Sequence, residues 1–227
     1  MNMRAAVAEL IGTFTLTFIG AGAGALAGGN GAGIVGVALA HGVVLMTIIY
    51  AWGAVSGAHV NPAVTLGLAV AGKVDWGKAV AYWIAQFIGA AIAGCMLAWL
   101  IGASSDATGL GATVGSLTPY AGSTAAGASA LKVIVLEAVL TFLLLVSIFG
   151  SAVMGRNGNM AGIAIGLTLT SDILMGGALT GASMNPARTF GPALATGHFE
   201  YLWMYIVGPC LGAIAAALVA GGSMKEK

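Results

Sequence analysis

TGASMNPARTFG, residues 180 to 191, is a near copy of SGAHVNPAVTLG, residues 56 to 67. We call each stretch a box. The boxes align without a gap, so that Asn61 falls on Asn185 and Pro62 falls on Pro186, each 124 positions further along the chain. An internal repeat of this kind indicates two structural units of one type. The chain is therefore interpreted as one unit written twice around the two boxes.

Each box predicts the start of a helix. Asn stands directly before Pro, where Asn can cap a helix and Pro can take the first helical position, because its fixed φ suits that position and its missing N–H costs nothing there. The helical segments that follow run from about 62 to 71 and from about 186 to 195. Ten residues rise about 15 Å, which is half of a hydrocarbon core of about 30 Å. The sequence therefore predicts two half-helices that enter a membrane without crossing it.

The composition places the chain in a lipid bilayer. Its mean hydropathy is +1.00, 59% of its 227 residues are hydrophobic and 7% are charged, whereas soluble domains have about 25% charged residues. A net charge of +1 gives no reason to expect a nucleic-acid partner. Cys95 and Cys210 stand in apolar segments without metal-ligand spacing. We therefore expect two packed thiols, no metal site and no cofactor.

Six apolar stretches are long enough to cross the bilayer. They lie at about 5–27, 34–53, 79–101, 131–153, 160–179 and 201–221. Residues 102 to 130, rich in Gly, Ala, Ser and Thr, indicate a loop that joins a first repeat, 1–101, to a second repeat, 131–221. The predicted fold is an all-α membrane protein of six transmembrane helices and two re-entrant half-helices, forming a single domain over residues 1–227.

The two repeats are predicted to have opposite orientations. Each holds three spans, an odd number, so the second repeat starts on the opposite side of the membrane and the boxes enter from opposite faces. Only Lys132 is a loop-end cation on the side away from the termini. The cations on the side of the termini are Arg4, Lys73, Lys78, Arg156, Lys225 and Lys227. Cytoplasmic termini follow from this bias, and the Gly, Ala and Val content favours a plasma or inner cell membrane.

Two carboxyl groups lie at corresponding positions inside predicted spans, one in each repeat. Glu9 stands in AELIGTF and Glu137 in the corresponding LEAVLTF. A carboxyl group at this depth is costly unless it is partnered or functional, and the irregular backbone of the boxes needs hydrogen-bond partners there. We expect Glu9 and Glu137 to support the boxes. The alternative is that they carry protons, although one acid per repeat makes no relay.

The boxes also predict a function. Two half-helix N-termini that meet near the midplane bring two positive dipole ends and the amides of Asn61 and Asn185 together. The backbone before each Asn leaves carbonyl groups unpaired, which is tolerated at that depth only where they line a wet cavity. Acceptors along a lane with donors and positive charge at its centre suit water or another small neutral molecule, and repel cations and protons. The prediction is a passive pore that excludes ions.

With its doubled NPA motif, six spans and two boxes, the chain resembles the aquaporins of the major intrinsic protein family over its whole length. The resemblance implies a homotetramer with one pore in each subunit and with both motifs at the pore centre. The motif residues are Asn61, Pro62, Ala63, Asn185, Pro186 and Ala187. The residues whose carbonyl groups match the family's pore lining are Gly57, Ala58, His59, Gly181, Ala182 and Ser183.

The resemblance also implies an outer constriction, which we call the selectivity filter. Counting from the boxes gives its four residues as His41, Ile173, Ala182 and Arg188. Strict water channels of the family usually have an aromatic residue at the first position and His at the second. The set found here is similar to those of plant tonoplast intrinsic proteins and the aquaporin-8 type, which implies passage of water and ammonia, with hydrogen peroxide as a further solute. Asp172, beside Ile173, has no partner that the sequence identifies.

Two other functions stay open. A glycerol facilitator is favoured by Ile206, where many water-type members have Trp, but the Asp that usually follows the second-box Arg in glycerol members is missing from ARTFGPA. A non-conducting structural protein on the same scaffold is the other alternative, and intact Arg188, Asn61 and Asn185 argue against it. An enzyme is not expected, because no nucleophile stands with a base or a metal cluster in the sequence.

Overall fold

The computed structural model describes residues 3–27, 31, 33–102, 109–114, 130–155 and 158–223. Over these ranges the chain is helical and has no strand, and six helical segments are long and apolar enough to cross a membrane. The spanning helices are α1 (Met3–Ala25), α2 (Gly33–Ser56), α4 (Trp76–Ile101), α5 (Ala130–Ile148), α6 (Ala161–Thr180) and α8 (Leu202–Ser223). The half-helices are α3 (Pro62–Val70) and α7 (Pro186–Thr196). The predicted all-α membrane fold is confirmed.

Three short turns complete the described chain. A π-helical turn, η2 (Phe149–Val153), continues α5, and a 3₁₀ turn, η3 (Gly158–Met160), leads into α6. The third turn, η1 (Gly109–Gly111), belongs to the segment predicted as a connecting loop at 102–130. Residues 103–108 and 115–129 of that predicted loop lie outside the described residues.

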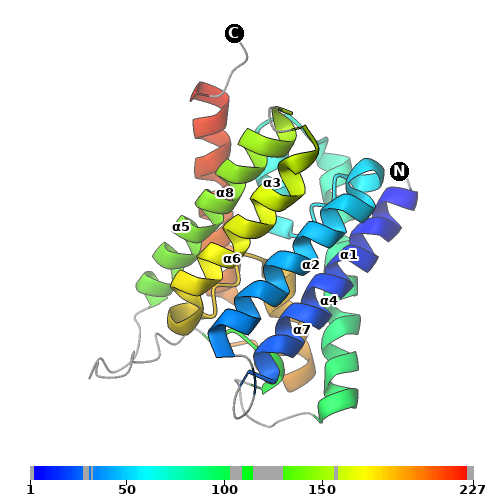
Figure 1. Cartoon of the computed structure of the whole chain (residues 1–227), viewed down its shortest axis with the longest axis vertical. Coiled ribbons are helices and arrows are strands. Elements are labelled where there is room, and N and C mark those ends of the chain that lie inside the picture. The colour runs from blue at the N-terminus through cyan, green and yellow to red at the C-terminus, as the bar shows by residue number, and fades with distance from the viewer. Residues whose placement is uncertain are drawn as a thin grey trace.

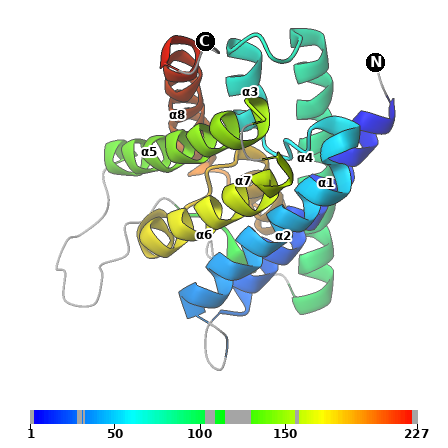
Figure 2. The same cartoon turned by 45° about the horizontal axis from the view of Figure 1, so that its top comes forward.

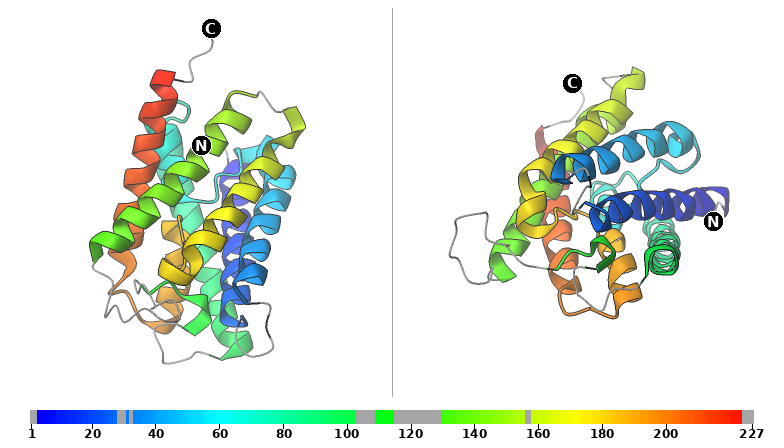
Figure 3. Two further views of the ribbon diagram at one scale, coloured as in Figure 1. Left: turned by 60° about the vertical axis from the view of Figure 1, so that its left-hand side comes forward. Right: turned by 60° about the horizontal axis from the view of Figure 1, so that its bottom comes forward.

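The helices are arranged as two interlocked repeats. Both ends of the chain lie at the same end of the molecule, as six crossings require; α3 lies in the half near the termini, and α7 lies in the opposite half (Figures 1 and 3). Figure 2 shows α5, α6, α2 and α1 side by side. α3 packs against α8, and α7 packs against α4, so each half-helix rests on the third spanning helix of the other repeat. The boxes therefore meet inside the bundle.

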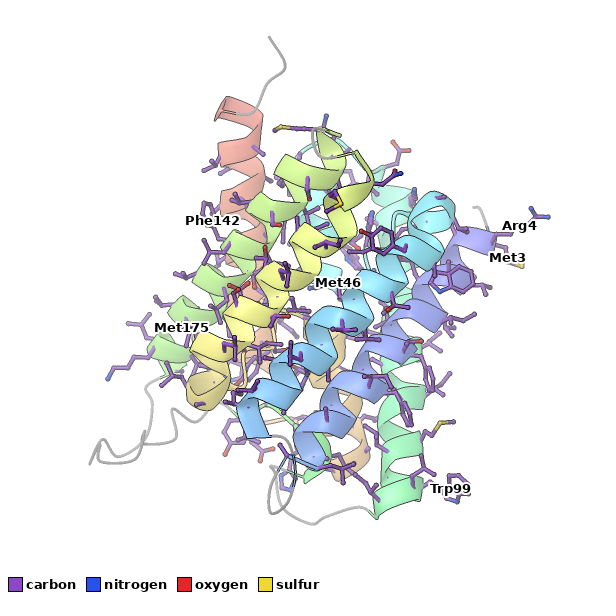
Figure 4. The ribbon with its side chains drawn as sticks, viewed as in Figure 1. Met3, Arg4, Met46, Trp99, Phe142 and Met175 are labelled. Atoms are coloured by element: carbon purple, nitrogen blue, oxygen red, sulfur yellow. The ribbon has the colours of Figure 1, made fainter. Side chains whose placement is uncertain are left out.

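The outer surface is apolar, as lipid requires. Large hydrophobic side chains are exposed on the spanning helices, among them Val43 and Met175. Trp99 is 82% exposed and points outward at the end of the molecule opposite Arg4 (Figure 4), where an aromatic side chain suits a membrane interface. The prediction of packed thiols is wrong for Cys95, which is exposed on α4, because an apolar segment in lipid has an outward face as well as a buried one.

Glycines let the half-helices approach the spanning helices closely. A Cβ atom added at Gly191 in α7 would lie 2.3 Å from the carbonyl oxygen of Ala90 in α4. We expect Gly191→Ala to destabilise the protein by about 1–3 kcal/mol, because the two backbones must move apart. Gly77→Ala on the exposed start of α4 is the matched control, since nothing lies within 4 Å of its added Cβ. Thermal unfolding in detergent measures both, and an equal effect at the two sites would contradict the packing argument.

Candidate functional site

The two boxes have the same backbone conformation. Asn61 (φ −157°, ψ 120°) caps α3 and Asn185 (φ −146°, ψ 105°) caps α7, each with Pro at the first turn. In the residues before each Asn, φ is positive at three places in the same pattern. These residues are Gly57, Ala58 and Val60 in the first box and Gly181, Ala182 and Met184 in the second. Positive φ is rare for a β-branched residue such as Val60, so the surrounding contacts must hold these segments in place.

The two Asn side chains connect the boxes to each other. Asn61 Oδ1 accepts from the N–H of Ala63 at 2.9 Å, and its Nδ2 donates to the carbonyl of Met184 at 2.8 Å. Asn185 Oδ1 likewise accepts from the first turn of α7, and its Nδ2 donates to the carbonyl of Val60 at 2.9 Å. Each amide has two N–H groups. The second N–H of each is left for the cavity that both residues line.

Glu9 supports the first box. Its carboxylate is fully buried in α1. Oε1 accepts from the Ser56 hydroxyl at 2.7 Å and from the His59 N–H at 2.9 Å. Oε2 accepts from the Val60 N–H at 2.7 Å and from the Gln86 amide at 2.8 Å. The carboxylate thus satisfies two backbone N–H groups that no helix or sheet could satisfy in that irregular segment.

Glu137 in α5 holds the same place in the second repeat. It is fully buried and accepts from the Thr180 hydroxyl at 2.7 Å, the Ser183 N–H at 3.1 Å and the Met184 N–H at 2.7 Å. Among the described residues it therefore accepts three hydrogen bonds where Glu9 accepts four. The missing one is the counterpart of the bond from Gln86.

A cavity of about 750 Å³ runs along the boxes. Its polar lining includes Gly57, Ala58, His59, Asn61, Ser183 and Asn185. Its apolar lining includes Leu16 of α1, Leu45 of α2, Leu144 of α5 and Leu169 of α6. Lys73 and Lys78 line it near the end of the termini, and no Asp or Glu stands among its described lining residues. The cavity thus combines a polar lane with apolar walls and an electropositive character.

His41 and Arg188 are bonded to each other at the far end of this cavity. His41 Nδ1 lies 2.9 Å from the carbonyl of Val37, and its Nε2 lies 3.3 Å from Arg188 Nε. These partners fix the tautomer of the His41 ring. The Val37 carbonyl can only accept, so Nδ1 donates to it, and the Arg188 guanidinium can only donate, so Nε2 accepts from it. His41 is therefore neutral with its proton on Nδ1. Arg188 Nη1 donates further to the carbonyl of Gly111 at 2.8 Å.

The other two predicted filter residues lie in an apolar cluster. Ile173 and Ala182 are buried and pack in one cluster with Ala38 and Leu140. They do not line the cavity, which ends at His41 and Arg188, and neither does Gly181. The structure therefore places His41 and Arg188 at the end of the cavity and the two apolar side chains in a packed cluster outside its lining, and the four-residue filter stays a prediction.

His59 lines the cavity on the side of the termini. Its Nδ1 lies 3.1 Å from the Thr65 hydroxyl, and its ring packs edge-on against Tyr82 with 5.1 Å between ring centroids. Lys78 Nζ lies 5.1 Å from the centroid of the same Tyr82 ring, a cation–π contact. These contacts fix the orientation of the His59 ring in the cavity lining.

Asp172 is buried beside the constriction, with 4% of its surface exposed. Its Oδ2 has no hydrogen-bond partner among the described residues, so the supporting partner expected for it is not found there. Within the same residues, no group of three His, Cys, Asp or Glu side chains could hold a metal ion.

Residues 109–114 belong to this site, although no motif in the sequence marks them as part of it. Leu110 is buried against Ala21 and Leu97, Gly111 accepts from Arg188, and Thr113 is buried with its hydroxyl 2.9 Å from that of Thr189. The segment is short, and its Gly, Ala and Thr residues are typical of any loop. Only the three-dimensional contacts identify it as part of the constriction.

Comparison with known proteins agrees with this geometry. A family model described as Major intrinsic protein matches residues 1–220. The chain is 43% identical to Aquaporin TIP4-4 of Zea mays over 229 residues, covering 97% of this chain and 86% of the relative. It is 42% identical to Aquaporin NIP1-4 of Oryza sativa subsp. japonica over 213 residues, covering 93% and 73%.

A solved structure shows the same fold. The X-ray structure of the aquaglyceroporin from Plasmodium falciparum superposes with a TM-score of 0.83 and 24% identity, over 99% of this chain and 97% of that one. At this identity the likeness concerns the fold alone. Together with the family match over nearly the whole sequence and relatives above 40% identity, it leaves one assignment: the chain belongs to the major intrinsic protein family, the family of the aquaporin channels.

Proposed function

We propose that the chain is a passive channel for water and ammonia, with hydrogen peroxide as a third solute, and that it excludes protons and other ions. The observation that carries this proposal is the pair of Asn61 and Asn185 amides, each with one N–H left for the same cavity at the start of a half-helix. A neutral solute with a lone pair can accept a hydrogen bond there. The two positive helix ends and Arg188 repel a cation at the same place.

The constriction supports ammonia as well as water. His41 offers its lone pair to Arg188 and not to the solute. Ile173 and Ala182 lie outside the cavity that ends at this pair, and we propose that their apolar side chains form the wall of the pore beyond that end. A small neutral molecule that is less polar than water loses less on passing such a wall than on passing one made of polar groups. Overall similarity does not select the solute, because relatives named TIP and NIP are equally close.

We also propose cytoplasmic termini in a cell membrane, and a homotetramer with one pore in each subunit. Arg4, Lys73 and Lys78 lie at the end of the termini, whereas Lys132 lies at the start of α5, at the other end. This charge difference supports the orientation. The carboxylates of Glu9 and Glu137 hold the two boxes in the membrane-embedded conformation that the pore needs.

Stopped-flow measurements on proteoliposomes test the solutes. Water flux is taken from light scattering in an osmotic step, and ammonia flux from an internal pH dye. We expect wild type to pass both. The double variant His41→Phe with Ile173→His should keep its water flux and lose about tenfold in ammonia flux, because a bulky ring and a polar wall penalise the less polar solute.

Val43→Phe, on the exposed side of α2, is the matched control and should change neither flux. If wild type passes water but not ammonia, the inference from the filter is wrong and the channel is selective for water. If wild type passes glycerol in the same vesicles, the glycerol alternative replaces the proposal. Wild-type vesicles no faster than protein-free vesicles would overturn the channel itself.

A further inference from the structure

A short segment of the connecting loop is built into the constriction. Leu110 anchors it in an apolar cluster, and Gly111 (φ +67°) approaches α1 so closely that an added Cβ would lie 2.1 Å from the carbonyl oxygen of Ala21. Two residues later, the Thr113 methyl group packs on the backbone of Gly181, where an added Cβ would lie 2.6 Å away. The segment thus fits between α1 and the second box.

Three hydroxyl groups form a chain from this segment to the cavity. The Thr113 and Thr189 hydroxyls are 2.9 Å apart, the Thr189 and Ser183 hydroxyls are 2.6 Å apart, and Ser183 donates to the carbonyl of Asn185 at 2.9 Å. A hydroxyl has one proton to donate. Because Ser183 gives its proton to Asn185, it accepts from Thr189. Thr189 then has no proton left for Thr113, so Thr113 is the donor at the head of the chain.

In the first repeat, a different residue donates to the threonine hydroxyl that corresponds to Thr189. Thr65 corresponds to Thr189, and it accepts at 3.0 Å from the amide of Gln86 in α4. The tyrosine hydroxyls of Tyr82 and Tyr205 fix the correspondence between α4 and α8, since each donates to the carbonyl of the residue that opens its box.

Four residues after each tyrosine stand Gln86 in α4 and Pro209 in α8. Proline has no N–H and no polar side chain, so α8 cannot donate to Thr189 as α4 donates to Thr65. The same difference explains why Glu137 accepts one hydrogen bond fewer than Glu9 among the described residues.

We propose that Thr113 is a positioning residue of the outer constriction, which supplies to Thr189 the donor that α8 lacks and thereby holds the Gly111 carbonyl against Arg188. The inference rests on the proposed channel function and concerns how its filter is kept in shape. Arg188 and Thr189 are consecutive, and their partners Gly111 and Thr113 are two residues apart. The two hydrogen bonds therefore join the first turn of α7 to residues 111–113 of the connecting loop. Loss of either bond loosens the other.

These two hydrogen bonds keep the Arg188 guanidinium at the wall of the cavity. Arg188 is held by His41 on one side and by Gly111 on the other. Without the Gly111 carbonyl, the guanidinium keeps a single fixed partner and can swing across the end of the cavity that His41 and Arg188 line. The same loss frees the Thr189 hydroxyl, and with it the Ser183 side chain that lines the cavity.

Thr113→Val tests the hydroxyl, because valine keeps the methyl group that packs on Gly181 and removes the donor. We expect water flux per folded channel to fall about threefold, the population change that one buried hydrogen bond supports. Thr113→Ser keeps the donor and loses the methyl group, and should restore wild-type flux. Thr47→Val is the matched control, since Thr47 donates only within its own helix on an exposed face.

Flux is divided by the amount of protein that remains monodisperse, so that a loss of folding alone does not count. Equal flux per folded channel for wild type and Thr113→Val overturns the inference, and so does Thr113→Ser with the same loss as Thr113→Val. If Thr113→Val does not assemble, Thr113→Ala is compared with Thr113→Ser by the same criterion. Wild type without any flux would instead refute the channel function, which the comparison with protein-free vesicles reveals separately.

Discussion

Proteoliposomes carrying Arg188→Ala are expected to leak ammonium and protons at least about tenfold faster than wild type, the scale on which a charged lining changes the local ion concentration. Among the described lining residues the cations are Lys73, Lys78 and Arg188, and both lysines lie at the mouth near the termini. Arg188 is thus the fixed charge at the opposite end of the cavity, where it is buried and little screened by solvent. Methylammonium uptake and dye-reported proton flux measure the leak.

Arg188→Lys separates the charge from the geometry. Lysine keeps the positive charge but has no planar fork, so it cannot bond His41 and Gly111 from two nitrogens as Arg188 does. We expect cation exclusion close to wild type and a changed water flux. If Arg188→Ala excludes ammonium as well as wild type does, the barrier lies elsewhere, and the helix ends at the boxes and the lining lysines Lys73 and Lys78 become the candidates.

The largest effect on stability is expected for Glu9→Leu. This change leaves the N–H groups of His59 and Val60 buried without an acceptor, at a cost of about 1–3 kcal/mol each. A total of about 2–6 kcal/mol is enough to prevent folding of a marginally stable protein. The yield of monodisperse protein and its unfolding temperature in detergent measure the loss.

Glu9→Gln is an intermediate variant. Its amide oxygen can still accept the hydrogen bonds made to one carboxylate oxygen of Glu9, whereas its NH₂ group faces the donors of the other oxygen. It should lie between wild type and Glu9→Leu. Glu200→Leu is the control at an exposed carboxylate, whose pKa is held below its usual range by hydrogen bonds from its own backbone N–H and from His198. Equal stability of Glu9→Leu and wild type would mean that the box holds its shape without the carboxylate.

The fold was predictable because its signals are local. Two Asn-Pro helix starts, apolar stretches of membrane length and the corresponding acids Glu9 and Glu137 are all visible in the sequence. The observed helix ends differ from the predicted ones by a few residues. For example, α2 ends at Ser56, whereas the sequence predicted an end at about residue 53. Nothing local marks that difference, since the residues concerned are equally compatible with a helix and a loop.

The site was predictable only in part, because its decisive contacts join distant segments. The positions of His41 and Arg188 came from a resemblance, but the hydrogen bond between them depends on how α2 meets α7. The role that we propose for Thr113 depends on its contact with Thr189 and on Pro209 in another helix. Such compensation between segments is invisible to any pattern read along the chain.

The crossed amide bonds at the centre have a consequence for how the protein is made. Asn61 needs the carbonyl of Met184, and Asn185 needs the carbonyl of Val60. During synthesis the first repeat emerges more than a hundred residues before those partners exist. The first box therefore lacks its hydrogen bonds to Met184 and Asn185 until the second box has been synthesised. The centre of the pore is therefore completed late in synthesis, when the two boxes meet and each Asn amide donates to a carbonyl of the other box.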